Sequence, residues 1–122
     1  MTIGPKLVEK MKTEILGRDY DLSFSFISKN EIKNLNRVYR SKDAPTDILS
    51  FPLEKNSGEI VICKQIAKLK SVNFNYSIRK YLCLLVIHGL LHLKGLSHGA
   101  KMEQLELEYL SKFYERSHNS RN

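Results

Sequence analysis

The most informative stretch of the chain runs from His88 to His98 and reads HGLLHLKGLSH. Two of its histidines, His88 and His92, are four residues apart, so on a helix they project from one face, one turn above the other. Gly95 has no Cβ and suits a left-handed helix end, which lets the chain turn and return His98 to the same point. Three imidazoles that meet with a fourth position open are typical of a catalytic zinc site. The stretch therefore predicts that His88, His92 and His98 bind one zinc ion per chain.

A histidine on an apolar helix is more often a core residue that hydrogen-bonds to a backbone group. That interpretation suits one histidine better than three at ligand spacing, because each buried ring would need its own partner. An unpaired buried polar group costs about 1–3 kcal/mol, whereas one metal ion satisfies all three rings at once. The remaining histidine, His118, falls in a polar tail and is not part of the predicted site.

Patterns on both sides of this stretch predict helices and strands that alternate along the chain. Helical periodicity covers residues 6–16, 30–39, 64–70, 77–94 and 102–115. Strand patterns cover residues 21–28, 47–51 and 59–63, with Pro52 ending the second strand and a turn joining it to the third as a hairpin. The helix that ends at Lys94 is apolar nearly all round, so it should be central and buried. We therefore predict an α+β fold, with a small mixed β-sheet packed on a central buried helix and further helices around it.

The length of 122 residues predicts one domain, residues 1–116, followed by a frayed polar tail, residues 117–122. No apolar run reaches the roughly 18 residues of a membrane span, and the N-terminal residues lack the apolar region of a signal peptide. We therefore expect a cytoplasmic protein with no membrane partner. Cys63 and Cys83 are expected to be free thiols that pack in the core, with metal ligation or a disulfide as the alternatives. No oligomeric state is predicted.

The net charge of +7 is unevenly distributed along the chain. Residues 1–61 carry 10 basic and 9 acidic side chains, whereas residues 62–122 carry 10 basic and only 4 acidic ones. A basic surface beside a metal site favours an anionic substrate, with nucleic acid as the leading candidate. A surface that is merely well solvated is the alternative that charge alone leaves open.

The histidine spacing is also that of the metzincin metalloproteases, in which Glu follows the first histidine as general base for the zinc-bound water. Here that position is Gly89, and glycine cannot take a proton. A chain of this size also lacks room for a large protease cleft. Proteolysis is therefore the disfavoured alternative.

Two further blocks accompany the histidine stretch. Residues 36–52 read NRVYRSKDAPTDILSFP, and residues 58–63 read GEIVIC. Together with residues 88–98, and in this order, they resemble the signature blocks of the YbeY family, which often has Asp where this chain has Glu59. Its members are bacterial metal-dependent endoribonucleases that take part in ribosomal RNA maturation and ribosome quality control. The resemblance implies zinc-dependent cleavage of single-stranded RNA.

Arg40 matches the family's arginine in the cleft that faces the metal, so the resemblance implies catalytic roles for Arg40 and His88. Physical chemistry supports this role, because phosphodiester cleavage builds up charge on the phosphoryl oxygens. A guanidinium can hold two of those oxygens at once, which a lysine cannot. Without the resemblance, Arg40 would be interpreted as a solvated loop residue.

The chain departs from the family pattern at two places. The family usually has Tyr-Asp before its third histidine, whereas this chain has Leu96 and Ser97. The neutral hydroxyl of Ser97 replaces only part of what an aspartate does for a ligand or a proton relay, so a lower metal affinity or rate is expected. The acidic segment that often follows the third histidine is also short, since residues 99–101 lead straight into the last helix.

Several other residues have both a functional and a structural interpretation. Ser50 and Glu59 match family positions beside the site, and Glu59 is either a proton acceptor or an ordinary strand carboxylate. Asp47 either contacts Arg40 or the region of Ser50, or forms a simple turn. Tyr39 either stacks on a base or packs in the core. Four basic residues either line an RNA path or form a solvated face: Lys64, Lys68, Arg79 and Lys80.

The sequence thus predicts a zinc-dependent, single-strand-specific endoribonuclease that acts on ribosomal RNA and has the ribosome as its partner. A ribosome-associated RNA-binding protein with a purely structural zinc is the main alternative. A metalloprotease is the weaker one.

Overall fold

The computed structural model describes residues 3–115, so the predicted tail at residues 117–122, with His118, lies outside the described residues. The elements follow in the order α1 (Pro5–Leu16), β1 (Asp21–Phe26), α2 (Lys29–Arg40), β2 (Ile48–Glu54), β3 (Ser57–Ile62), α3 (Lys64–Asn73), α4 (Ile78–Lys94) and α5 (Ala100–Leu110). A π-helical turn, Ser111–Glu115, continues α5. The α+β class is confirmed. The predicted boundaries of α3 were too short at the C-terminal end, because the helix continues to Asn73.

The three strands form one small mixed sheet in the order β1-β3-β2. β1 pairs in parallel with β3, and β2 pairs antiparallel with β3, so the predicted hairpin is confirmed. The predicted end of the second strand at Pro52 is wrong, because β2 continues through Pro52 to Glu54. β2 is an edge strand, where the missing N–H of a proline is tolerated, and the pairing register shifts between these two residues.

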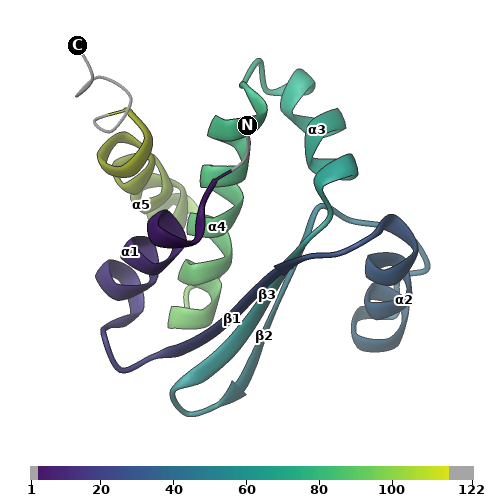
Figure 1. Cartoon of the computed structure of the whole chain (residues 1–122), viewed down its shortest axis with the longest axis horizontal. Coiled ribbons are helices and arrows are strands. Elements are labelled where there is room, and N and C mark those ends of the chain that lie inside the picture. Colours follow the sequence, from purple (N-terminus) through teal and green to yellow (C-terminus); the bar gives the residue numbers. More distant parts are fainter. Residues whose placement is uncertain (1–2, 116–122) are drawn as a thin grey trace.

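The helix predicted to be central is α4, which packs on the sheet with α1 and α5 beside it (Figure 1). Most of its residues between Tyr81 and Leu91 are buried. The Ser77 hydroxyl accepts a hydrogen bond from the Lys80 backbone N–H at 3.1 Å and fixes the start of the helix. Gly95 ends it in the left-handed conformation, with φ of 110°. Both predicted boundaries of this helix are confirmed.

Gly89 lies where α4 comes closest to the sheet. A Cβ atom at this position would lie 2.9 Å from Cδ1 of Ile60 and 3.1 Å from Cδ1 of Ile48. A methyl group would require small shifts of these isoleucine side chains, and a larger side chain would hold α4 away from β2 and β3. The glycine inside the histidine stretch therefore lets the helix that carries the site pack directly on the sheet.

α2 is held in place by its own small core and by its N-terminal cap. Ser28 and Glu31 form a reciprocal capping box, in which each side chain accepts a hydrogen bond from the backbone N–H of the other residue. Ile32 is fully buried and packs in a cluster with three residues from the sheet region: Leu49, Val61 and Cys63. These contacts hold the N-terminal part of α2 against the sheet, and at its other end Arg40 donates a hydrogen bond to the backbone carbonyl of Ser50 on β2.

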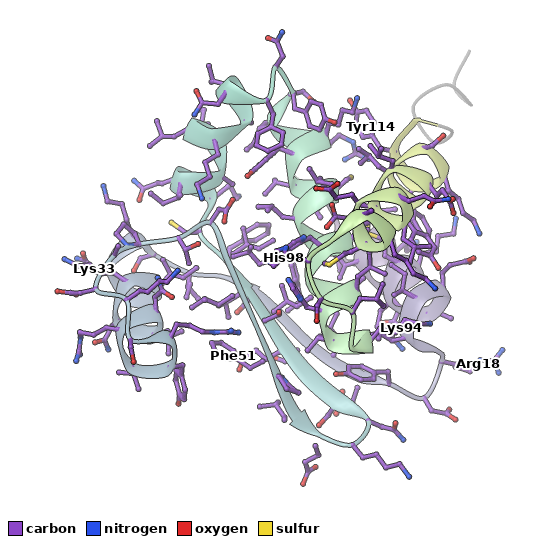
Figure 2. The ribbon with its side chains drawn as sticks, turned by 180° about the vertical axis from the view of Figure 1, so that it is seen from behind. Arg18, Lys33, Phe51, Lys94, His98 and Tyr114 are labelled. Atoms are coloured by element: carbon purple, nitrogen blue, oxygen red, sulfur yellow. The ribbon has the colours of Figure 1, made fainter. Side chains whose placement is uncertain are left out.

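The prediction that the two cysteines are free thiols in the core is confirmed. Cys63 and Cys83 are both buried free thiols. Among the described helices, none combines the length and the apolar character that a bilayer span requires. In the reverse view, Lys33 on α2 and Arg18 before β1 point away from the fold on opposite sides of the picture (Figure 2).

Candidate functional site

The structure brings the three predicted histidines together at the C-terminal end of α4. The Gly95 N–H donates to the carbonyl of His92 at 2.9 Å, and the Leu96 N–H donates to the carbonyl of Leu91 at 3.1 Å. This pair of bonds is a Schellman closure of the helix. The turn brings His98 back, so that one ring nitrogen from each histidine lies within 4.8 Å of the other two. The sequence prediction that these three residues converge is confirmed.

The ring nitrogens that point away from the cluster have partners. Nδ1 of His88 hydrogen-bonds to the carboxylate of Glu106 on α5. Nδ1 of His92 lies 3.2 Å from the backbone carbonyl of Leu96, to which its N–H donates. In both rings Nδ1 thus faces an acceptor, and Nε2 is directed into the cluster.

The distance between the two Nε2 atoms fits a shared metal ion. Nε2 of His88 and Nε2 of His92 lie 3.1 Å apart. Two imidazole ligands of one tetrahedral ion, each at about 2.0–2.1 Å, lie about 3.3 Å from one another. The His98 ring completes the group, with its centroid 5.1 Å from that of His88 and 4.8 Å from that of His92. The three rings are thus positioned to bind one metal ion.

The electrostatics of the cluster keep its central ring neutral. Burial lowers the pKa of the His92 imidazole, and the neighbouring His88 and His98 lower that pKa further. A metal binds the neutral form of histidine and competes with protons for it. A lowered pKa therefore favours the ligand form at neutral pH.

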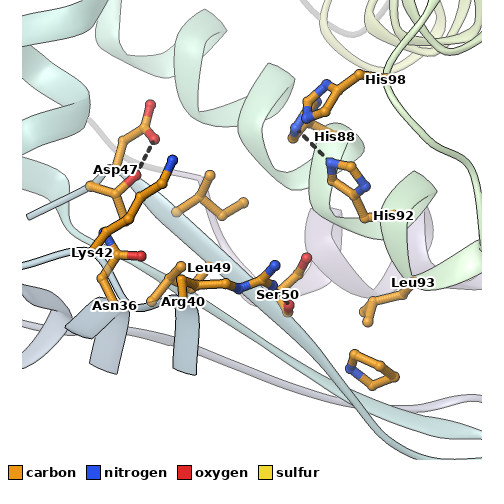
Figure 3. Close-up of a pocket in the computed structure, with 13 residues that line it drawn as sticks. Asn36, Arg40, Lys42, Asp47, Leu49, Ser50, His88, His92, Leu93 and His98 are labelled. Atoms are coloured by element: carbon orange, nitrogen blue, oxygen red, sulfur yellow. Dashed lines mark hydrogen bonds between the residues drawn. The ribbon is translucent and has the colours of Figure 1, made fainter. Parts of the chain in front are cut away.

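A cleft of about 700 Å³ opens in front of the histidines. His88, His92 and His98 lie on one side of it, and Arg40 and Lys42 lie on the other (Figure 3). The cleft therefore combines a candidate metal centre with two cationic side chains. That combination suits a substrate whose reacting group is an anion.

Arg40 is exposed to the cleft but held in one orientation. Its Nη2 donates a hydrogen bond to the backbone carbonyl of Ser50 at 2.8 Å. Its guanidinium carbon lies 5.7 Å from the centroid of the Phe51 ring, within the range of a cation–π contact. A guanidinium has five N–H donors, so most of them remain for a ligand in the cleft.

Asp47 lines the cleft, but its carboxylate serves the fold. It accepts a hydrogen bond from the Tyr81 hydroxyl at 2.7 Å and forms an ion pair with Lys70 at 3.6 Å. Asp47 is buried and joins the start of β2 to α3 and α4. The suggested contact between Asp47 and Arg40 is therefore wrong, because the carboxylate contacts Tyr81 and Lys70 instead.

The other residues singled out from the sequence lie in different places. Ser50 lines the cleft and orients Arg40 through its backbone, whereas Glu59 is not part of the cleft lining. Tyr39 is 63% exposed, so the core position is wrong, and its ring packs against Phe51 with centroids 5.2 Å apart. The four basic residues suggested for an RNA path do not line this cleft: Lys64, Lys68, Arg79 and Lys80.

Glu106 is the site residue that sequence reasoning missed. A signal for it was present, because Glu106 lies four residues after Met102 and four before Leu110, which are both buried. This spacing places the carboxylate on the inward face of α5, where an apolar residue is the norm. Its partner, His88, is on another helix, so the pattern indicated an unusual carboxylate without indicating its contact.

Comparison with known proteins agrees with this geometry. The family model described as Endoribonuclease YbeY matches residues 4–117. The chain belongs to the YbeY family. An Endoribonuclease YbeY of Staphylococcus epidermidis is 36% identical over 110 residues, which cover 79% of this chain and 71% of the relative. One from Staphylococcus aureus is 34% identical over the same shares.

The fold is also similar to that of a solved structure. The solution structure of TM1509 from Thermotoga maritima superposes with a TM-score of 0.68 at 32% identity. The match covers 98% of this chain and 90% of the other. The resemblance to the YbeY family drawn from three sequence blocks is therefore confirmed over nearly the whole chain. As a member of this family, the protein is an endoribonuclease, and RNA is its substrate class.

Proposed function

We propose that this protein is a zinc-dependent endoribonuclease that cuts single-stranded RNA during ribosomal RNA maturation and ribosome quality control. The observation that supports this most is the placement of three converging imidazoles and one arginine on opposite sides of a single cleft. We assign the activity to residues 1–116 as one domain, with its place in the cytoplasm and the ribosome as its partner. The basic character of residues 62–122 supports a polyanionic substrate.

The ligand set explains the choice of metal. Three neutral imidazoles with an open fourth side suit zinc, which would polarise a phosphate or lower the pKa of a bound water to about 7. His88 and His92 hold the ion through Nε2, while Glu106 and the Leu96 carbonyl fix the orientation of their rings. All three histidines line the cleft, so a bound ion would be accessible from it.

Arg40 binds the phosphate. The hydrogen bond to Ser50 and the contact with Phe51 already hold the guanidinium in place, so its side chain loses little conformational entropy when a phosphodiester binds. The remaining N–H groups donate to two phosphoryl oxygens at once and stabilise the charge that develops on them. Lys42 adds a second positive charge on the same side of the cleft.

The two alternatives fit the site less well. A metalloprotease of this spacing needs a carboxylate after the first histidine, yet a side chain at position 89 would point at Ile48 and Ile60, not into the cleft. A purely structural zinc is normally enclosed by four protein ligands. Here the described cluster supplies three histidines beside an open cleft.

The first experiment tests the activity itself. Purified protein should contain about one zinc per chain and should cut a structureless RNA, and a chelator should remove both properties. Duplex RNA should be a poor substrate, because in-line attack needs a backbone that can bend into the cleft. Casein serves as the protease control. Cleavage of casein without cleavage of RNA would favour the protease, and cleavage of neither by zinc-loaded protein would favour a structural metal.

The second experiment tests Arg40. Arg40→Glu should leave zinc content and thermal stability nearly unchanged, because the side chain is exposed. RNA cleavage should fall about 100–1000-fold, the usual cost of removing one preorganised charge-stabilising donor. Arg37→Glu is the matched control, since Arg37 is exposed on the same helix and does not line the cleft. Equal loss of cleavage in both variants would mean that overall charge, and not the position of Arg40, is what matters.

A further inference from the structure

A second pocket, of about 350 Å³, opens on the other side of the histidines. It shares His88, His98, Asp47 and Ile48 with the main cleft. A volume of this order lies within the range of small-molecule sites. Because the two spaces meet at the candidate metal centre, a nucleotide held there by its phosphate reaches the second pocket without leaving the site.

The two spaces differ in charge. Arg40 and Lys42 line the main cleft. The second pocket has the carboxylates of Glu103 and Glu106 in its wall, and its lining within residues 3–115 includes no lysine or arginine. Carboxylates repel a phosphate and accept hydrogen bonds from the amino groups of bases. The phosphate backbone therefore belongs in the main cleft, and an uncharged group belongs in the second pocket.

An aromatic ring stands at the second pocket. Phe74 is 51% exposed, although phenylalanine is one of the residues most often found inside proteins. Its ring centroid lies 5.1 Å from that of Tyr81 and 5.8 Å from that of Tyr76. These contacts hold the ring, while the exposed half of its surface remains available for a flat ligand. Leu84 and Met102 supply further apolar wall.

The loop that carries Phe74 is also fixed. The N–H of Phe74 donates to the carbonyl of Lys70 at 3.3 Å, and that of Tyr76 donates to the carbonyl of Ser71 at 3.0 Å. Between them, Asn75 adopts a left-handed conformation with φ of 60° and closes the turn. The ring is thus presented by an ordered turn at the end of α3.

The geometry points to a nucleobase subsite in this second pocket. It takes the base of the nucleotide whose phosphate lies at the histidines and Arg40, with the base stacked on Phe74. The subsite rests on the proposed function for the position of that phosphate. Stacking on an aromatic ring suits single-stranded RNA, because every base has a flat face and only an unpaired base can be turned into a pocket.

The test compares two probes that differ only in the base. Adenosine 5′-monophosphate and ribose 5-phosphate are titrated into the full-length, zinc-loaded protein, and binding is measured by calorimetry. The mononucleotide should bind about tenfold more tightly, within the range that stacking of one base provides. Phe74→Ala should remove this advantage and leave the affinity for ribose 5-phosphate unchanged. Phe74→Tyr, which retains the ring, should keep it.

Two further variants guard against a change in folding. Phe74→Leu keeps apolar bulk against Tyr76 and Tyr81 without a flat ring, so it should lose the advantage while melting near the wild-type temperature. Leu69→Ala is the matched control, because Leu69 is 67% exposed on α3, the helix that precedes Phe74, and lies outside the pocket lining. It should retain the full advantage of the mononucleotide.

The outcomes separate the subsite from the activity. Equal affinity for the two probes, no binding of either, or an advantage that survives in Phe74→Ala and Phe74→Leu would each overturn the subsite. An advantage that depends on the Phe74 ring, in a protein that cuts no RNA, would support the nucleobase pocket and refute the proposed ribonuclease activity.

Discussion

Glu106 offers a direct test of the candidate metal centre, because its carboxylate contacts His88, one of the proposed metal ligands, and is not itself a proposed ligand. Its carboxylate hydrogen-bonds to Nδ1 of His88, and the side chains are only 15% and 24% exposed, respectively. With a metal ion bound at the cluster, this contact would hold the His88 ring in place and make its Nε2 a stronger ligand. Two substitutions separate these effects. Glu106→Gln keeps an oxygen that accepts the hydrogen bond, whereas Glu106→Leu removes the acceptor.

The expected magnitudes follow from this contact. Loss of an outer partner of a ligating histidine typically lowers metal affinity about 10–100-fold, or about 1.4–2.7 kcal/mol. The pair is largely shielded from solvent, so little of its effect is screened. We therefore expect Glu106→Leu near the upper end, at about 100-fold, and Glu106→Gln near the lower end, at about tenfold.

The assay is competition for zinc against a chromophoric chelator at low ionic strength, with thermal melting of each variant as the check on folding. Glu108→Gln and Glu108→Leu are the matched controls, because Glu108 is exposed on the same helix and its carboxylate accepts a hydrogen bond from the Gln104 amide at 3.2 Å. Both controls should bind zinc like the wild type. A folded Glu106→Leu variant with wild-type zinc affinity would refute the role of this carboxylate.

Three further predictions concern packing, pH and salt. Gly89→Ala should change stability little, because the small shifts that the methyl group requires of Ile60 and Ile48 are offset by a gain in helix propensity of about 1 kcal/mol. Gly89→Glu should cost at least about 3 kcal/mol and give no casein cleavage, since its charge would be buried against Ile60. Burial raises the pKa of the Cys83 thiol from 9.0 to about 11, so the folded chain keeps a proton that the unfolded chain releases. The contribution of Cys83 to the free energy of unfolding should then be unchanged below pH 9 and fall by about 2–3 kcal/mol as the pH rises to 11. Burial also raises the pKa of the Tyr81 hydroxyl, so Cys83→Ala should make the total fall in denaturant titrations shallower without abolishing it; an equally steep fall in that variant would contradict the assignment. With about four phosphate contacts on a single strand, the log–log dependence of RNA affinity on salt should have a slope of about −3, and a flat dependence would contradict phosphate binding.

The sequence predicted most where the signal was local. The start of α4 at Ser77, its end at Gly95 and the return of His98 each depend on the conformational preferences of a few neighbouring residues. Pro52 was misjudged because its effect depends on whether β2 is an edge strand, which is a property of the whole sheet. The residue pattern of a strand does not indicate which strands will lie beside it in the sheet.

The contacts that complete the site join segments distant in the sequence, and they were missed for that reason. Asp47 accepts a hydrogen bond from Tyr81 on α4, and His88 bonds to Glu106 on α5. The sequence shows that both residues are acidic, but it does not indicate which of many possible donors each carboxylate will contact. Only the packing of α4 against the sheet and α5 selects between them.

These distant contacts also change what the substitution at Ser97 means. An aspartate there was expected to support a metal ligand, and its absence was expected to weaken the site. The structure gives His88 a carboxylate from α5 and gives His92 the carbonyl of Leu96, so two of the three ligands are oriented without any help from position 97. Neither of these two hydrogen bonds involves the side chain at position 97. A departure next to the signature thus leaves the orientation of both helical ligands intact.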